Sequence, residues 1–480
     1  MNTLEHGNRK KLYFLGILGL FLAVLGEMIP VWAEEPTAET TYRLVSQRKA
    51  GDVDLVQKEI DVAGRLVIYQ DAAGESVSRP ALSEEASSRQ KERKIPLKIH
   101  GEQEYEETLI TQGNLLQGEQ GKPTLGAWYF LKDETSIQID SETATPHLKP
   151  EQPLMGVDIH DAEVHIFRPD GLLTREEKDL VDLQGNTLLL DFLLPNRGGM
   201  KIGDSWKQSP DTIALLLQLD LIFQLDVQTK LLEVKKGIAI LETSGWVEGS
   251  SDGTSSKMDV TGKMYFDLNR GRIVWFGMLI RENRAAGYVA PGMEVVARLQ
   301  YRIRPLKQPQ HLTESVVSNI TFDNTRYDQL LFEDVGQVWR CVLDSSWYAT
   351  TWNERQATFR MVRGGNLIAQ CSVASPINVQ ETQDLSLEAF AENIQKTLGA
   401  GFGEIVEQTE TLRDDGTRIY RIDVSGKVDE LPLRWIYYLL TRKGEKPLQE
   451  TVVFTVEEKL LEDFGSADSM MIESFEWASP

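Results

Sequence analysis

The chain has 480 residues and a formal net charge of −22, from 51 Lys and Arg against 73 Asp and Glu. A chain this acidic should repel nucleic acid and anionic lipid surfaces, so we expect no nucleic-acid partner. Hydrophobic residues make up 41% of the sequence, enough for two cores, and two Cys exclude a scaffold built on disulfides.

Residues 1–33 are typical of a cleavable signal peptide. A basic run at 8–11 precedes an apolar run at 12–26, and the small residue Ala33 ends the segment before two glutamates. A helix over the apolar run reaches roughly 22 Å, short of the roughly 30 Å of bilayer hydrocarbon. We therefore expect export to the periplasm or the extracellular space, with Glu34 as the first mature residue. The alternative is an uncleaved anchor, which would be the chain's membrane contact.

Residues 34–304 are expected to form a mostly antiparallel β domain. At 294–304 apolar and polar residues alternate, which predicts a strand with one buried face. Runs at 258–267 and 273–280 predict a hairpin that turns at 269–272, and another hairpin is predicted to turn at 235–237. The stretch 74–94 has no apolar period, so we expect a mobile loop there.

One helix is predicted inside this domain. Ser209, Pro210 and Asp211 supply an N-cap, a proline at the first helical position and an acidic first turn. The apolar run that follows extends the expected helix from Thr212 to Phe223. Such a helix would cover the open face of the sheet.

A linker is expected at 305–327, where Pro305 and Pro309 lie in polar sequence without a period. In residues 328–480 strands alternate with helices. Glycines 364 and 365 predict a tight hairpin turn, and Asp384 and Ser386 are expected to open a helix.

The strand predicted at 431–441 has two apolar faces, one with Trp435 and Tyr437 and the other with Ile436 and Tyr438. A strand of this kind lies inside a sheet that is covered on both sides. The predicted fold class is therefore α+β: a mostly antiparallel β domain with one covering helix, then an α/β/α sandwich around an antiparallel sheet.

The order of "VWRCVLDSSWY", "LSLEAFAENIQKTLG", "RIYRIDVSG", "LRWIYYLL", "VVFTVEEKLLEDF" and "DSMMIESFEW" resembles the PsbP and DcrB-like superfamily over residues 330–480. The resemblance implies an α/β/α sandwich and a non-enzymatic accessory protein that binds a larger assembly. It carries over no catalytic residue. The N-terminal part, with "MKIGDSW" at 200–206, is similar to uncharacterised β-rich regions of exported bacterial proteins.

One stretch is a candidate metal site, because it contains Asp158, His160, Asp161, Glu163 and His165. In a single strand, Asp161, Glu163 and His165 share one face while His160 points to the other. The two His would then be unable to share an ion, so we favour a solvated acidic strand and predict no metal.

Two further sequence patterns could mark a binding site, but we favour a structural role for each. The "GAGFG" run at 399–403 follows a predicted helix, so we expect Gly399 or Gly401 to cap that helix rather than to bind a nucleotide. The row Arg298, Arg302 and Arg304 is expected to pair with acids on adjacent strands, with a partner-docking face as the alternative.

The cysteines also have two readings. In the predicted hairpin register Thr358 lies opposite Cys371, so a bridge would require Cys341 to come from the other neighbouring strand. We favour two buried free thiols over a disulfide.

No catalytic motif stands out: G-x-S-x-G, H-E-x-x-H and C-x-x-C are all missing from the sequence. We therefore predict no catalytic residues and no cofactor. Three functions remain open. The first is an exported, non-catalytic interaction protein that docks on an envelope partner through its C-terminal domain. The second is a carrier of an apolar ligand held between the N-terminal sheet and the helix at 212–223, and the third is an unrecognised hydrolase.

Overall fold

The computed structural model describes residues 40–70, 76–77, 91–113, 124–195, 198–251, 253–353, 356–374, 385–444 and 447–478. The predicted signal peptide and residues 74–75 and 78–90 of the predicted loop lie outside these ranges. Residues 41–480 form one compact unit, and everything below refers to this unit. Within the described part, no helix has the length and apolarity that crossing a bilayer requires.

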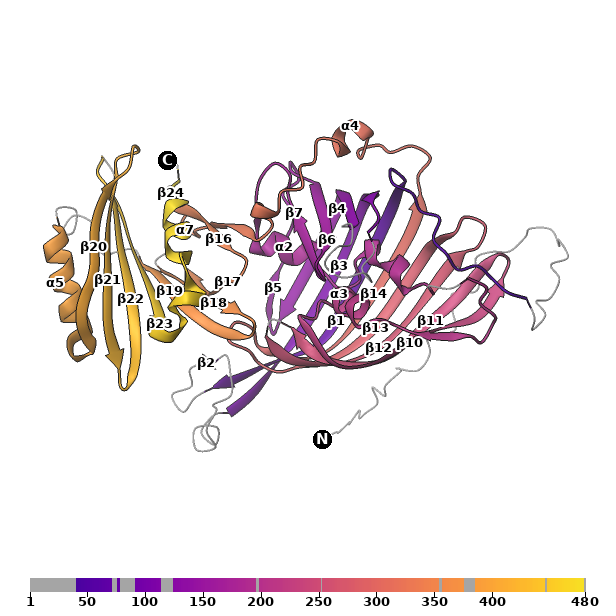
Figure 1. The fold of residues 1–480 in the computed structure, drawn as a ribbon, viewed down its shortest axis with the longest axis horizontal. Coiled ribbons are helices and arrows are strands. Elements are labelled where there is room, and N and C mark those ends of the chain that lie inside the picture. The colour runs from indigo at the N-terminus through magenta and orange to yellow at the C-terminus, as the bar shows by residue number, and fades with distance from the viewer. Residues whose placement is uncertain are drawn as a thin grey trace, which may run out of the picture. The chain divides into compact units, whose positions relative to one another are not determined.

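The largest sheet of the described chain is antiparallel and has 13 strands, which Figure 1 shows as long, curved strands lying side by side. Its main order is β7-β6-β4-β3-β1-β14-β13-β12-β11-β10-β9. Its strands are β1 (Val53–Gln70), β2 (Ser76–Val77), β3 (Lys91–Thr111), β4 (Thr124–Ile139), β5 (Glu142–Ala144), β6 (Leu154–His160), β7 (Glu163–Phe167), β9 (Ser205–Lys207), β10 (Leu221–Lys235), β11 (Ile238–Ser251), β12 (Thr254–Asp267), β13 (Arg272–Arg284) and β14 (Gly292–Pro305).

The alternation predicted near residue 300 is confirmed in β14. Leu299 and Tyr301 are buried, whereas Arg298 and Arg302, which flank them in the strand, are exposed. Both predicted hairpins are confirmed as β12–β13 and β10–β11, and the latter turns through Lys236 and Gly237 at positive φ. The mobile loop expected at 74–94 is wrong in part, because residues 76–77 form β2 and residues 91–94 begin β3, and both strands pair with β1.

Three short helices lie on the buried face of the large sheet: α2 (Arg175–Val181), the 3-10 helix η1 (Thr187–Leu193) and α3 (Pro210–Leu217). The predicted start of α3 is confirmed, because the Ser209 side chain accepts from the Thr212 backbone N–H. Its predicted end at Phe223 is wrong. Gln218 adopts a left-handed conformation with φ of 56° and ends the helix, and the apolar residues that follow form β10.

The segment 305–327, expected to be a linker, contains α4 (Glu314–Val317) and the 3-10 turn η2 (Asn324–Arg326). Its residues Leu312, Ile320 and Tyr327 are buried in a cluster with residues of β1, β4 and β7. Glu106 of β3 accepts hydrogen bonds from the backbone N–H groups of three successive residues of the segment, 310–312, at 2.9–3.0 Å. The domain boundary drawn here stays a prediction, although this stretch has its own packed contacts.

The rest of the described chain forms two further sheets. A 4-stranded sheet has the order β24-β16-β15-β8, and a 7-stranded sheet has the order β17-β18-β19-β23-β22-β21-β20. The strands are β8 (Leu173–Thr174), β15 (Gln329–Glu333), β16 (Trp339–Asp344), β17 (Trp347–Asn353), β18 (Gln356–Arg363), β19 (Asn366–Ala374), β20 (Phe402–Leu412), β21 (Thr417–Val428), β22 (Leu431–Arg442), β23 (Leu448–Glu457) and β24 (Glu476–Trp477).

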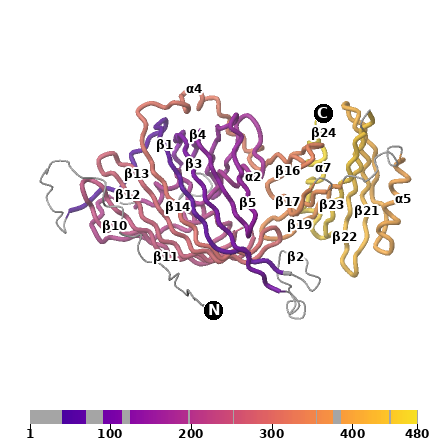
Figure 2. The backbone as a smooth tube through the Cα atoms, turned by 180° about the vertical axis from the view of Figure 1, so that it is seen from behind, coloured from indigo at the N-terminus to yellow at the C-terminus, as the bar shows by residue number. Residues whose placement is uncertain are grey.

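The two faces of the 7-stranded sheet are covered differently. Helix α5 (Leu387–Leu398) lies along one face in both views of the backbone (Figures 1 and 2). The other face packs against β16, the short helix α6 (Leu461–Phe464), which follows the 3-10 turn η5 (Glu458–Leu460), and α7 (Ala467–Glu473). Trp339 and Cys341 of β16 are buried in that core.

The predicted fold class is therefore wrong. The described chain is mostly strand, in large antiparallel sheets, and it is not a balanced α+β protein with a C-terminal α/β/α sandwich. On one face of the 7-stranded sheet, β16 of a second sheet packs together with α6 and α7, so this layer does not consist of helices alone.

The two apolar faces predicted for β22 are confirmed. Tyr437 packs in the cluster beneath α5, and Tyr438 packs in the cluster on the opposite face. Trp435, which shares the face of Tyr437, is 7% exposed. Ser386 caps α5 as predicted, by accepting from the Ala389 backbone N–H, whereas Asp384 lies outside the described residues.

Candidate ligand-binding site

A cavity of about 380 Å³ lies on the buried face of the large sheet. Its floor is formed by side chains of β1, β3 and β14, and its roof by residues of α2 and the turn that follows it. Apolar residues make up most of the lining: Ile60, Val62, Leu97, Ile99, Ile137, Ala144, Pro146, Leu180, Leu183, Met293, Val295 and Ala297. Ile60 and Val62 stay partly accessible because the cavity lies over them. The cavity can therefore admit an apolar group without displacing the core.

One charged side chain, Lys58, lies in the floor of this cavity. It is 7% exposed, and its ammonium lies 5.8 Å from the centre of the Tyr301 ring on the adjacent strand β14. Burial lowers the pKa of Lys58 to about 7, although Asp182 and Asp133 act in the opposite direction. Near neutral pH this amine therefore exchanges between charged and neutral forms inside an apolar space.

Helix α2 is held over the cavity by its own cap and by a buried ion pair. Thr174 and Glu177 form a capping box, in which each side chain bonds the backbone N–H of the other residue. The guanidinium of Arg168 donates two hydrogen bonds to the Glu177 carboxylate, at 2.7 and 3.1 Å. These contacts position Leu180, which packs over the cavity from the same helix.

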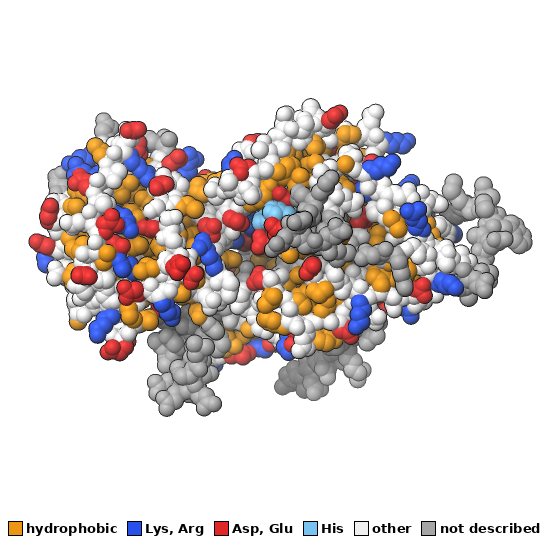
Figure 3. All heavy atoms as spheres, viewed as in Figure 1, with side chains coloured by type: hydrophobic (Ala, Val, Ile, Leu, Met, Phe, Trp, Pro, Cys, Tyr) orange, Lys and Arg blue, Asp and Glu red, His pale blue; other side chains and the backbone are white. Residues whose placement is uncertain are grey.

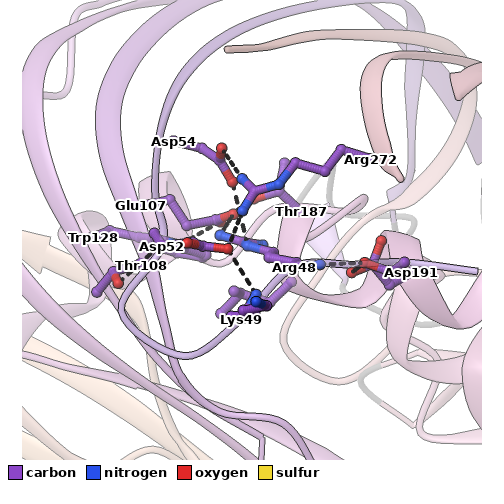
Figure 4. A network of polar contacts seen from close by, with 12 residues as sticks. Arg48, Lys49, Asp52, Asp54, Glu107, Thr108, Trp128, Thr187, Asp191 and Arg272 are labelled. Carbon is purple, nitrogen blue, oxygen red and sulfur yellow. Dashed lines mark hydrogen bonds and ion pairs between the residues drawn. The ribbon is translucent and has the colours of Figure 1, made fainter. Parts of the chain in front are cut away.

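A second buried network, made of hydrogen bonds and ion pairs, joins the segment before β1 to the sheet (Figure 4). Arg48 donates to Glu107 of β3 at 2.8 Å and lies 3.3 Å from the Asp54 carboxylate. Arg272 of β13 reaches the same Asp54 at 2.7 Å, and Trp128 of β4 donates to Glu107 at 2.8 Å. Segments far apart in the sequence are thereby joined at the Glu107 end of the buried face.

Burial raises the pKa of two carboxyl groups in this network. Desolvation raises the pKa of Asp54 despite the nearby guanidinium groups of Arg48 and Arg272. The pKa of Asp191, which accepts from Ser46 at 2.7 Å, is also raised by desolvation. Each carboxylate named here has a donor or a cation beside it. We therefore interpret the network as a structural one that stabilises the sheet, not as a reactive site.

The kinds of side chain on the surface differ between the large sheet and the C-terminal strands. In the space-filling view of Figure 3, apolar side chains gather on the visible face of the large-sheet part. Over the C-terminal strands, acidic and basic side chains are interspersed.

The histidines of the metal candidate lie closer together than predicted. The stretch is a hairpin of β6 and β7, not one strand, because Asp161 and Ala162 form a turn at positive φ. The turn sets Asp158 opposite His165 and brings the rings of His160 and His165 to 4.9 Å.

The prediction of a solvated acidic strand fails for part of this hairpin, because Asp158 is buried. Asp158 accepts from the Tyr327 hydroxyl at 2.9 Å and lies 2.9 Å from Nδ1 of His160. Glu163 and Asp161 are exposed at the turn. Among the described residues, no group of three or more His, Cys, Asp or Glu is arranged to hold a metal ion.

The other sequence candidates are placed as follows. Gly399 caps α5 with φ of 53°, as expected. Cys341 and Cys371 are buried free thiols, as favoured, but a bulge after Met361 sets Phe359 rather than Thr358 opposite Cys371.

The arginine row lies on the exposed face of β14, where Arg298 is opposite Asp61 of β1. Arg302 is opposite Gln57 and Trp275, and Arg304 is opposite Leu55. Only the first of the three therefore has an acidic residue directly across from it in these strand pairs.

Sequence reasoning missed both Lys58 and the helix over it, although signals for each were present. Lys58 has the same parity as Val56, Ile60 and Val62 in β1, so it occupies an inward position of an alternating strand. The run from Thr174 to Glu177 has the spacing of a capping box.

Comparisons with known proteins assign no family. No family model and no curated protein matches the chain. The Ran-binding protein Mog1p of Saccharomyces cerevisiae is 13% identical over 32% of this chain and 96% of its own, with a TM-score of 0.25. A lipovitellin structure is 7% identical over 56% of this chain and 26% of its own, with a TM-score of 0.31. OccK5 of Pseudomonas aeruginosa is 7% identical over 85% and 98%, with a TM-score of 0.13. Scores this low carry no argument about function.

Proposed function

We propose that this chain is an exported, non-catalytic protein of the cell envelope whose large sheet carries an apolar ligand. The observation that supports the proposal is the apolar cavity between the floor of β1, β3 and β14 and the roof of α2. Its volume of about 380 Å³ falls in the range of roughly 300–1,000 Å³ that is typical of small-molecule sites. Well-packed protein interiors leave few voids larger than a water molecule, so a space of this size suits a ligand.

The position of the cavity differs from the one expected. Helix α3 packs into the core, with Ile213, Leu216 and Leu217 almost fully buried, and the cavity lies beneath α2 instead. Gln218, directly after α3, lines its edge. The carrier hypothesis therefore concerns α2 and the residues of β1, β3 and β14.

Export of the protein is physically consistent with carriage of an apolar ligand. An apolar molecule is poorly soluble in the aqueous space outside the cytoplasm, and each methylene moved from water into the cavity contributes about 0.8 kcal/mol. The signal-peptide pattern of residues 1–33 supports export, with Glu34 as the proposed first residue of the mature chain.

A second proposed role is docking on an envelope protein, consistent with the PsbP and DcrB-like resemblance of the sequence. Strand β20 is the last strand of the 7-stranded sheet and pairs only with β21 among the described strands. Its residues from Gly403 onward are exposed, including Val406 and Leu412 at 49% and 69%. An exposed edge of this kind can accept a strand from a partner.

Ligand carriage is tested with a pair of substitutions on β3. Ile99 lines the cavity, whereas its neighbour Lys98 points away from it and is exposed. Ile99→Trp should fill the cavity, and Lys98→Trp introduces the same ring on the opposite face. Saturation of the mature chain with the neutral fluorescent probe N-phenyl-1-naphthylamine measures binding.

We expect one saturable site in the wild type and in Lys98→Trp, and at least a tenfold weaker affinity in Ile99→Trp. Equal affinity in both variants, or no saturable site in the wild type, would overturn the proposal.

A further inference from the structure

Lys58 lies in the cavity as an unpaired cation. Among the described residues, the Lys58 ammonium takes part in no hydrogen bond and no ion pair. Its one close electrostatic contact is with the Tyr301 ring. A buried ammonium without a partner is costly, because burial removes the water that stabilises its charge. The charge of Lys58 therefore lacks a counter-charge, and the apolar side chains that line the cavity cannot supply one.

The carboxylates that influence Lys58 are already engaged elsewhere. Asp133 accepts from Gln103 at 3.0 Å and from the Leu148 backbone N–H at 2.9 Å. Asp182 accepts from Gln218 at 2.5 Å. Neither comes within 4.0 Å of Lys58 to form an ion pair, so each acts on it only from a distance.

The polar groups of the cavity are distributed unevenly. Strand β3 contributes Gln103, and β13 contributes Glu282 and Arg284, which form an ion pair with each other at 2.7 Å. Helix α2 contributes Glu176 and Asp179, both exposed. Gln184 and Gln218 also line the cavity, β4 and β14 contribute Thr135 and Ala297, and Tyr301 lies opposite Lys58 in the strand pair.

We propose that the ligand is a single-chain amphiphile with one carboxylate, whose head group pairs with Nζ of Lys58 while its chain lies along the apolar floor. This inference rests on the proposed carrier function and specifies its ligand class. A carboxylate supplies the counter-charge that the buried ammonium lacks, and a charge-assisted hydrogen bond of this kind is stronger than a neutral one.

The dimensions of the floor agree with such a ligand. From Lys58 to Val62 the strand rises about 13 Å, at roughly 3.3 Å per residue. The side chains on this face between those ends, Ile60 from β1 and Ile99 from β3, are aliphatic. A head group at Lys58 therefore leaves a continuous apolar surface for the chain.

The test compares dodecanoate with dodecanol and methyl dodecanoate, which share its chain but carry no charge. Displacement of N-phenyl-1-naphthylamine from the full mature chain measures all three. We expect the wild type to bind dodecanoate at least tenfold more tightly than either neutral compound at pH 7. In Lys58→Met, which keeps a similar volume, we expect that preference to disappear while dodecanol binding remains.

The pH dependence adds a second readout. Above the pKa of Lys58, about 7 in the empty cavity, binding of the anion must bring a proton to the amine, so the affinity for dodecanoate should fall between pH 7 and 9. The other titratable groups that line the cavity are Glu176, Asp179, Glu282 and Arg284, and carboxylates in general ionise well below pH 7. Burial raises the pKa of Asp182, and its carboxylate in turn raises the pKa of Lys58, so Asp182→Asn should keep the slope but move the fall in affinity to lower pH.

The outcomes separate the two proposals. If the three compounds bind the wild type equally, or Lys58→Met still prefers dodecanoate, the head-group inference is wrong while the carrier function stands. If none of them binds and the probe finds no saturable site, the carrier function itself is wrong.

Discussion

Arg168 and Glu177 form a buried, two-pronged ion pair beneath the helix that covers the cavity, with N···O distances of 2.7 and 3.1 Å. Arg168 lies in the loop after β7, and Glu177 lies in the first turn of α2. The same carboxylate also accepts the backbone N–H of Thr174 and of Lys149. One side chain thus joins the cap of α2, the loop after β7 and the segment that follows β5.

Replacing Glu177 with Gln should reduce the free energy of unfolding by about 3–5 kcal/mol, because it leaves the Arg168 charge buried and unpaired. Chemical denaturation of the mature chain at pH 7 measures the loss. Glu176→Gln, one position away on the exposed side of α2, is the control and should change stability by less than about 0.5 kcal/mol. Equal effects of the two substitutions would contradict the assigned role of the ion pair.

The same pair should make stability sensitive to acid. Desolvation acts to raise the pKa of Glu177, but hydrogen bonds from Arg168 and from backbone N–H groups outweigh it and lower the pKa overall. A carboxyl with a lowered pKa in the folded state stabilises the protein above its unfolded pKa, near 4.3, and this contribution is lost as the pH falls through the folded pKa. The difference between wild type and Glu177→Gln should therefore shrink below about pH 4.

Lys58→Met should make the ligand-free protein more stable at neutral pH. The pKa of Lys58 is about 7 in the folded protein against 10.5 in the unfolded chain, so stability is lost as the pH falls from 10.5 toward 7. The gain from the substitution should be about 1–4 kcal/mol at pH 7, on the scale known for buried ionic groups replaced by apolar ones. It should decrease at pH 9, and a gain that is constant with pH would show that the ammonium is solvated.

Trp435→Ala should destabilise the 7-stranded sheet by about 3–5 kcal/mol, since it removes a ring that is only 7% exposed. Trp352 lies in β17, an edge strand of the same sheet, is 53% exposed and provides the matched control. Trp352→Ala should cost less than about 1 kcal/mol. Denaturant unfolding followed by circular dichroism distinguishes the two, and similar losses would contradict the interior placement of β22.

Cys341 and Cys371 should resist thiol reagents in the folded protein. Burial raises the pKa of the Cys341 thiol and of the Cys371 thiol, and both side chains are 0% exposed. Because the thiolate is the reactive form, labelling with iodoacetamide should be slow until denaturant is added, after which two thiols per chain should react. Rapid labelling of the native chain at pH 8 would show that the core around β16 and β19 opens.

Local patterns in the sequence were sufficient for several elements of the fold. The alternation around Leu299 predicts β14 because a strand in a one-sided sheet has a period of two. The glycines at 364 and 365 predict the β18–β19 turn, because both adopt positive φ there. Ser209 and Ser386 each predict a helix start, since an N-cap is a local hydrogen bond.

The tertiary structure decided what local patterns leave open. The apolar run after Gln218 fits a helix and a strand equally well, and its pairing with β11 makes it β10. The hairpin turn at Asp161, rather than strand parity, brings His160 and His165 together.

The candidate site, too, depends partly on local sequence patterns and partly on tertiary packing. The alternation of β1 implies that Lys58 points inward, but its burial depends on α2 and on β14, which lie more than a hundred residues away in the chain. A cavity is a volume left between elements that are distant in sequence, so no periodicity within one strand can reveal it. The sequence by itself therefore determined the strands, turns and caps, whereas long-range packing alone decided that an unpaired amine lies in an apolar space.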